Sequence, residues 1–261
     1  MTLDLVQNAD LLKEDVSRPF SSERFNMRRL PVLVGRVPIE SIGNHPSSLD
    51  MLIKLPGGPL CLPEPYASCD GVGRFLVACL AREDALLPGW RKTHHLYLTF
   101  DRREVQPGGT HRNEGWHFDG MQGARYPDKL NACHQYVLST HLPTEYASHP
   151  VDASGLDDLR HDWFRELGSQ IPEATPVFRP APGEICLMSA YQMHRSPLAG
   201  PQDGGWRTFI RLDVSLKEQD RAGNTLNPDL PAPWEFVPRS LPEGLQTPVR
   251  DAGWERGEKF V

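Results

Sequence analysis

The sequence predicts a mainly β fold with supporting helices, and three observations favour it. Short apolar segments of strand length are more numerous than the longer amphipathic segments that suit helices. Proline, at 25 residues, and glycine, at 22, are abundant, which indicates many loops. With 261 residues, 39% of them hydrophobic, the chain can bury a core without disulfides or a structural metal. A β-sandwich or barrel with helical support fits these features better than a helical bundle.

The first part of the chain is expected to be irregular, and the first predicted helix follows it. In residues 1–60, short apolar runs at 30–34 and 51–55 are broken by proline and glycine. Residues 71–87 contain FLVACLAREDALL, which has the apolar spacing of an amphipathic helix and stops before Pro88.

The middle of the chain carries the predicted strands, with a turn-rich link at 101–109 and a helix at 155–167. The strands are expected at residues 95–100, 130–142, 177–179, 184–191 and 206–216. We interpret the chain as one domain, 1–261. It would have a β core at about 95–216, a helical and irregular part at 1–94, and a proline-rich tail at 217–261 that wraps over a surface.

Charge and composition exclude some partners. The net charge is −6, and the densest basic stretch, residues 24–29, is interpreted as a solvated face, so we expect no nucleic-acid partner. No run of about 18 apolar residues is present, and the first residues include acids where a signal peptide would be basic. Five cysteines form no CxxC pair. We therefore expect a cytoplasmic protein with reduced thiols and no membrane partner.

A candidate metal site begins in GTHRNEGWHFDGMQG, residues 109–123. His117 and Asp119 flank a single residue, so in extended backbone both side chains point to the same side. A third candidate ligand, His194, follows the apolar run in PGEICLMSAYQMHRSPL, which predicts a strand that ends on His194. Two histidines and one carboxylate leave other positions of an octahedral Fe(II) open for substrate and oxygen.

Two arginines follow on the last predicted strand, GWRTFIRLDVSL. Arg207 can clamp a carboxylate with two parallel hydrogen bonds, which a lysine cannot match. Arg211 lies on the same strand face, roughly 13 Å further along at about 3.3 Å per residue. Because only one of them can reach the same buried carboxylate, we favour Arg207 and expect Arg211 to face the substrate or an outer salt bridge.

These motifs resemble those of the Fe(II)/2-oxoglutarate-dependent oxygenase superfamily, in its phytanoyl-CoA and taurine dioxygenase-like branch. The resemblance covers roughly residues 95–216 and implies a double-stranded β-helix (distorted jelly roll). It implies that the H-x-D pair and His194 hold Fe(II), and that Arg207 binds the distal carboxylate of 2-oxoglutarate. Thr144 would contact the same co-substrate. Many members show R-x-S, whereas Phe209 stands two residues after Arg207 here.

The function implied by the resemblance is a 2-oxoglutarate-dependent non-haem iron dioxygenase. With O2 it would oxidise a C–H bond of a small polar molecule, such as an amino acid, sugar or secondary metabolite, and release succinate and CO2. Halogenating members replace the carboxylate ligand, so the presence of Asp119 implies hydroxylation or a related oxidation. Gln122, Arg125 and Arg211 are candidate substrate-binding residues.

Two other functions remain open. A cupin-type metal enzyme would use the same three ligands without a co-substrate and without the Arg207 clamp. A sensor built on the same barrel would bind iron and 2-oxoglutarate without turnover. Three spare histidines, His111, His134 and His141, are expected to be supporting or surface residues.

Overall fold

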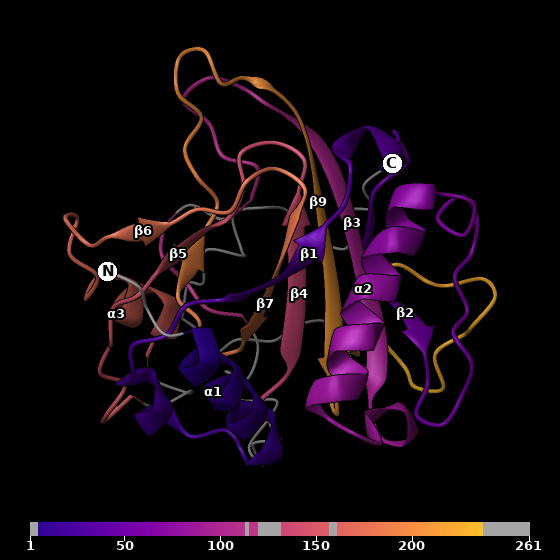
Figure 1. Cartoon of the computed structure of the whole chain (residues 1–261), viewed down its shortest axis with the longest axis horizontal. Helices are drawn as coiled ribbons and strands as arrows, with labels where there is room; N and C mark the ends of the chain where they lie inside the picture. The colour runs from indigo at the N-terminus through magenta and orange to yellow at the C-terminus, as the bar shows by residue number, and fades with distance from the viewer. Residues whose placement is uncertain (1–4, 113–114, 120–131, 157–160, 237–261) are drawn as a thin grey trace.

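The computed structural model describes residues 5–112, 115–119, 132–156 and 161–236, and it contains two antiparallel sheets (Figure 1). The larger sheet has the strand order β1-β7-β4-β9-β3-β2, and the smaller has the order β6-β5-β8. The strands are β1 Val32–Arg36, β2 Ser48–Lys54, β3 His95–Val105, β4 His134–Ser139, β5 Glu145–Ala147, β6 Val177–Phe178, β7 Glu184–Ser189, β8 His194–Arg195 and β9 Gly205–Ser215. The expectation of a mainly β fold with few helices is confirmed.

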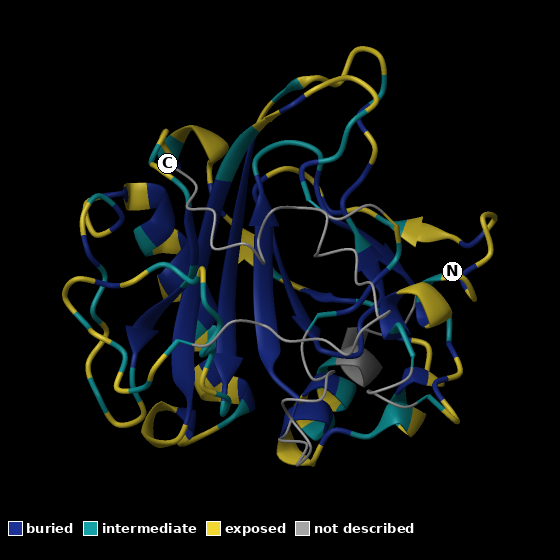
Figure 2. Cartoon of the chain, turned by 180° about the vertical axis from the view of Figure 1, so that it is seen from behind, coloured by how far each residue is buried: buried dark blue, intermediate teal, exposed yellow. Residues whose placement is uncertain are grey.

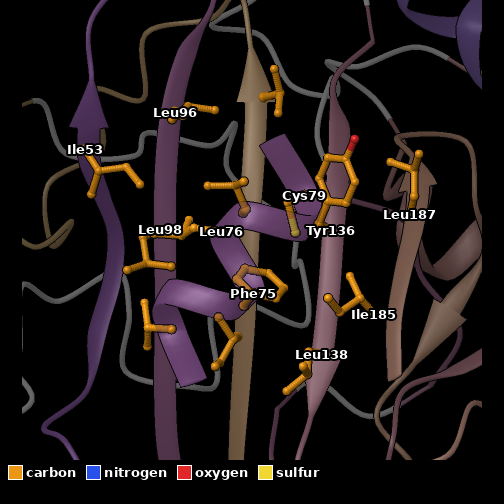
Figure 3. Packing of buried hydrophobic residues seen from close by; sticks show 14 of the residues in the cluster. Ile53, Phe75, Leu76, Cys79, Leu96, Leu98, Tyr136, Leu138, Ile185 and Leu187 are labelled. Atoms are coloured by element: carbon orange, nitrogen blue, oxygen red, sulfur yellow. The ribbon is translucent and has the colours of Figure 1, made fainter. Parts of the chain in front are cut away.

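Three α-helices accompany the sheets in the described part of the chain: α1 Leu5–Ser17, α2 Asp70–Leu86 and α3 Trp163–Gly168. Single 3₁₀ turns occur at Ser22–Phe25, Ile39–Ser41 and Trp90–Lys92. The long helix α2 lies against one face of the larger sheet, and Phe75, Leu76 and Cys79 point from it toward the strands (Figure 3). The apolar spacing in the sequence therefore predicted the right helix in the right place.

The central strand β9 separates an apolar face from a polar one. Ile210, Leu212 and Val214 belong to the core beneath α2. The alternate residues of β9, which include Arg207 and Arg211, point to the opposite face because successive side chains of a strand alternate. Seen from behind, the central strands of the larger sheet, β4 and β9 among them, are still buried (Figure 2). The polar face is thus a covered interior surface and not a solvent-exposed one.

The expectation of an irregular stretch at 1–60 is wrong, because α1, β1 and β2 form there. Strands β1 and β2 are the two edges of the larger sheet, and each pairs through a register shift. Edge strands with bulges lack the clean alternation of apolar residues that identifies a strand in sequence, so short runs broken by proline and glycine concealed them.

Two other boundaries differ from the sequence expectation. The link expected at 101–109 is strand as far as Val105, because β3 pairs with β9 residue by residue from His95↔Ser215 to Val105↔Gly205. The helix expected at 155–167 begins only at Trp163, and residues 157–160 lie outside the described chain. The Asp162 side chain accepts a hydrogen bond from Arg165 N and caps the helix start.

The basic stretch at 24–29 is not simply a solvated face, which corrects the sequence interpretation. Arg29 is buried, and both Arg24 and Arg29 donate hydrogen bonds to the Asp15 carboxylate of α1. The Ser189 hydroxyl donates to the same carboxylate at 2.6 Å, which ties α1 to the end of β7. Two of the three arginines therefore stabilise a helix contact, and Arg28 alone of the three is exposed.

The residues after β9 pack against the sheet edge. Thr225 N donates to Leu49 O at 2.8 Å, and the Asn227 amide donates to Leu52 O at 2.8 Å. All five cysteines are free thiols, and Cys133 and Cys186 are buried as expected. Among the helices of the described residues, none is long and apolar enough to cross a membrane.

A buried histidine joins three elements of the fold. His134 Nδ1 lies 2.9 Å from the Glu83 carboxylate of α2, and its Nε2 lies 3.1 Å from Leu12 O of α1. The Tyr136 hydroxyl donates to the same carboxylate at 2.6 Å. Burial alone would lower the pKa of His134, but the Glu83 carboxylate more than offsets that effect and raises it.

Stability should consequently fall as pH rises. Because the folded-state pKa of His134 lies above the unfolded value of about 6.5, the stabilisation is complete below that value and is lost as pH rises through the folded one. We expect the free energy of unfolding in urea to decline as pH rises above about 6.5. Glu83→Gln should lower it by about 3 kcal/mol at the acidic end and flatten the decline. An equally steep decline in both proteins would assign it to other groups.

Candidate metal centre

Three side chains with metal-ligating atoms meet where the two sheets approach each other. The ligand atoms of His117, Asp119 and His194 all lie within 4.8 Å of one another. The backbone brings them together, because His117 and His194 form an antiparallel bridge with N-to-O distances of 2.9 and 2.8 Å. The structure thus gathers the three candidate ligands that the sequence suggested from two distant segments.

The two imidazoles are held in the same way. His117 Nδ1 lies 2.9 Å from Gly115 O, and His194 Nδ1 lies 2.9 Å from Gln192 O. A carbonyl oxygen can only accept, so each Nδ1 donates and each Nε2 keeps its lone pair. A backbone carbonyl on one ring nitrogen is the usual way to orient a histidine whose other nitrogen binds metal.

The electrostatics of the cluster suit a divalent cation. Burial and the neighbouring His194 lower the pKa of His117 to about 4, so this imidazole is neutral at pH 7. Burial alone would raise the pKa of Asp119, but Arg211 and the two histidines hold it well below its usual range. A neutral imidazole and an ionised carboxylate are the forms in which these side chains bind metals.

The position of His194 differs from the sequence expectation. The strand that was expected to end on His194 ends at Ser189, and a turn follows. His194 then starts the short strand β8 of the smaller sheet, where it pairs with Tyr146. The turn is held by the Gln192 amide, which donates to Ala147 O and to Met193 O. Sequence could not separate the two strands, because no proline or glycine marks the turn.

Arg207 is a buried cation that forms no ion pair with any carboxylate of the described residues. Its side chain is 1% exposed, and Nε donates to His141 O at 3.0 Å and to Leu142 O at 2.9 Å. Nη2 donates to the Ser139 hydroxyl at 2.9 Å and reaches the Thr144 hydroxyl at 3.5 Å. Nη1 is buried and has no hydrogen-bond partner within the described chain.

Burying the Arg207 guanidinium without an ion-pair partner carries a free-energy cost for the protein alone. Burial and the nearby Arg112 lower the pKa of Arg207 to about 9. No described carboxylate forms an ion pair with it, although buried charges are normally paired. An incoming carboxylate that met Nη1 would supply both the hydrogen bond and the compensating charge. The environment of Arg207 therefore fits a binding site for an anion.

Arg211 has the opposite environment, although it lies on the same strand face. Nη1 lies 2.6 Å from Asp119 Oδ2, Nη2 lies 2.8 Å from Asp50 Oδ1, and Nε lies 3.2 Å from Asp213 Oδ2. Each ion pair of Arg211 within the described chain is to a carboxylate of the protein itself. Between the outer salt bridge and the substrate contact considered from sequence, this geometry favours the salt bridge.

The other expected site residues are distributed as follows. Gln122 and Arg125 lie outside the described residues. His141 contributes its backbone carbonyl to Arg207, and His111 lies 3.4 Å from the Asp101 carboxylate. His134 belongs to the α1–α2 contact. Phe209 has two guanidinium groups near its ring, those of Arg112 and Arg207 at 5.0 and 5.4 Å from the ring centroid.

Two residues of the site were not found from sequence. Ser139 could have been, because it alternates with Gln135 and Val137 along a predicted strand and so faces the same side. Asp50 could not. It lies in a segment expected to be irregular, and its φ of 47° places it in the left-handed region, which no sequence pattern indicates.

Comparison with known proteins finds only solved structures of low sequence identity. No family model matches the chain, and no curated protein matches it. Among solved structures, the non-heme monooxygenase ThoJ with nickel is 12% identical, with 90% of this chain and 93% of that chain covered and a TM-score of 0.37. AviO1 from Streptomyces viridochromogenes Tue57 is 13% identical, with coverage of 82% and 96% and a TM-score of 0.38.

A third match is an oxidoreductase of the 2OG-Fe(II) oxygenase family from Burkholderia pseudomallei. It is 14% identical, with 85% and 81% of the two chains covered and a TM-score of 0.34. The matches include non-heme monooxygenases and members of the superfamily that the sequence motifs resemble. Identities and TM-scores this low do not establish a function.

Metal binding by the three side chains can be measured directly. We expect the protein to bind one Co(II) per chain, and His194→Ala to weaken binding by more than about a hundredfold. Loss of a ligand should cost more than the ten- to hundredfold that loss of a supporting residue costs. His149→Ala is the matched control, because His149 is a partly buried histidine outside the cluster. Equal Co(II) affinity in the two variants would exclude His194 as a ligand.

Proposed function

We propose that the chain is an Fe(II)- and 2-oxoglutarate-dependent oxygenase. The reaction would consume one O2, one 2-oxoglutarate and one substrate C–H bond, and would give succinate, CO2 and a hydroxylated or otherwise oxidised product. One observation carries the proposal. A cluster of two histidines and one carboxylate shares an interior face with a buried arginine that has an unpaired Nη1. A metal-chelating dicarboxylate needs both features.

In this proposal, His117, Asp119 and His194 hold Fe(II), the two imidazoles through Nε2. Bound Fe(II) would supply the redox chemistry that couples decarboxylation of 2-oxoglutarate to oxidation of the substrate. Arg207 would bind the distal carboxylate through Nη1, and the Thr144 hydroxyl lies close enough to assist. His117, His194, Arg207 and Thr144 are buried, and burial strengthens each charged contact that these groups make.

The length of the polar face supports this assignment. Arg207 and Arg211 are separated by roughly 13 Å along β9, at about 3.3 Å per residue. Arg211 touches Asp119, so a five-carbon diacid could extend from the ligand cluster toward Arg207. Because Asp119 provides an anionic ligand, we propose oxygen transfer and not halide transfer as the outcome.

The finer features of fold and substrate are also proposals. We infer that the two sheets are the halves of a double-stranded β-helix (distorted jelly roll), within one domain of 1–261 that has its core at about 95–216. The substrate is proposed to be a small polar molecule. The enclosed polar face supports this choice, and Gln122 and Arg125 remain candidate substrate contacts beside the H-x-D motif.

Turnover separates this function from its two alternatives. Fe(II)-loaded protein should release succinate from 2-oxoglutarate, and one member of a panel of amino acids, sugars and other polar metabolites should stimulate the release. Binding of 2-oxoglutarate without succinate release by any panel member would favour a sensor. Oxidation or isomerisation of a panel member without 2-oxoglutarate would favour a cupin-type enzyme.

The arginine clamp gives a quantitative prediction. Arg207→Lys should weaken 2-oxoglutarate binding by about 1.5–3 kcal/mol, or roughly ten- to a hundredfold, because one charge-assisted bond is lost. Titration calorimetry with Mn(II) and without oxygen measures it. Arg103→Lys is the matched control, because Arg103 pairs directly with Arg207 across β3 and β9 but has its own carboxylate, Asp101. Unchanged affinity in Arg207→Lys would remove Arg207 from the co-substrate site.

A further inference from the structure

A row of polar side chains crosses the larger sheet beneath Asp119. Arg211 lies at its centre on β9 and is directly opposite Thr99 of β3. On one side, the Thr99 hydroxyl donates to Asp50 Oδ1 at 2.7 Å, and Asp50 belongs to β2. On the other, the Gln135 amide of β4 donates to Asp213 Oδ1 at 2.9 Å. The row therefore spans four neighbouring strands and ends, through Arg211, on the Asp119 carboxylate.

The backbone of Asp50 is shaped for this contact. Its φ of 47° is in the left-handed region, which is uncommon for a residue other than glycine. The pairing of β2 with β3 shifts register between Ser48 and Met51, so Asp50 lies in a bulge. A bulge redirects a side chain, and here the carboxylate accepts from Thr99 and from Arg211 Nη2. Local backbone strain of this kind often accompanies a functional site.

The row of polar side chains supports the Asp119 carboxylate, which its own backbone does not hold in place. Asp119 lies beyond the His117–His194 bridge and belongs to no named strand, so its own backbone has little support within the described chain. Strand β9 is hydrogen-bonded on both sides, to β3 and to β4. Arg211 extends from this rigid strand and fixes one carboxylate oxygen of Asp119 at 2.6 Å.

We propose that Arg211 is a positioning residue for the metal centre, which orients the Asp119 carboxylate and is itself held by Asp50 and Asp213. The inference rests on the proposed role of Asp119 as a metal ligand. Arg211 would act through Asp119, so it differs from Arg207, which would bind the co-substrate itself. Of the two arginines on this face of β9, Arg211 would orient a metal ligand and Arg207 would bind the co-substrate.

Two substitutions test the positioning role of Arg211 without replacing a proposed metal ligand. Asp50→Asn removes the charge that holds Arg211 Nη2, and asparagine tolerates a left-handed backbone at least as well as aspartate. Arg211→Lys keeps the positive charge but cannot contact Asp119 and Asp50 with a fixed fork. For each variant we expect Co(II) affinity to fall about tenfold and the visible absorption of bound Co(II) to change, because an outer partner of a ligand has been lost.

Asp15→Asn is the control, because Asp15, like Asp50, is a carboxylate that pairs with arginine, but it supports α1. It should lower the melting temperature and leave Co(II) affinity and absorption unchanged. If Asp50→Asn and Arg211→Lys fold and bind Co(II) with wild-type affinity and spectrum, the positioning role is overturned. If wild-type protein binds no Co(II), the proposed metal centre itself fails, and this inference fails with it.

Discussion

The alternation of side chains along β9 is the constraint on which the rest of the site depends. Ile210, Leu212 and Val214 fill the core under α2, and this packing fixes where the alternate residues, Arg207 and Arg211 among them, point. A slip of one residue would place Arg207 and Arg211 in the apolar core and turn Ile210 and Leu212 toward the polar face. Pairing with β3 along eleven consecutive positions prevents such a slip. The register of β9 therefore determines both the packing of the hydrophobic face and the geometry of the polar face.

The same strand also shows how one residue type can have two roles. Arg207 and Arg211 are both buried, and both lie on the polar face of β9. Arg211 is surrounded by the carboxylates of Asp50, Asp119 and Asp213, so its charge is satisfied within the protein. Arg207 is held by carbonyl and hydroxyl oxygens, which orient the guanidinium but do not neutralise it. An unneutralised buried cation is costly, and that cost favours binding of an anion.

The sequence predicted those parts of the molecule that depend on local pattern. The helix at Asp70–Leu86 and strands such as Gly205–Ser215 have clear apolar periodicity. The H-x-D spacing and His194 pointed to the three side chains that meet in space. The Asp119–Arg211 contact was not predicted, because it joins residues from different elements. Asp50 was hidden by its bulge, since a residue out of register has no periodicity to reveal it.

The central claim is that one interior face binds a metal and a diacid together. The most direct test is to titrate 2-oxoglutarate into the protein without oxygen, once with Mn(II) present and once after its removal with a chelator. The account predicts saturable binding of one 2-oxoglutarate per chain that is weakened at least about tenfold without the metal, since chelation would then be lost. Equal affinity with and without Mn(II), or no binding in either case, would contradict it.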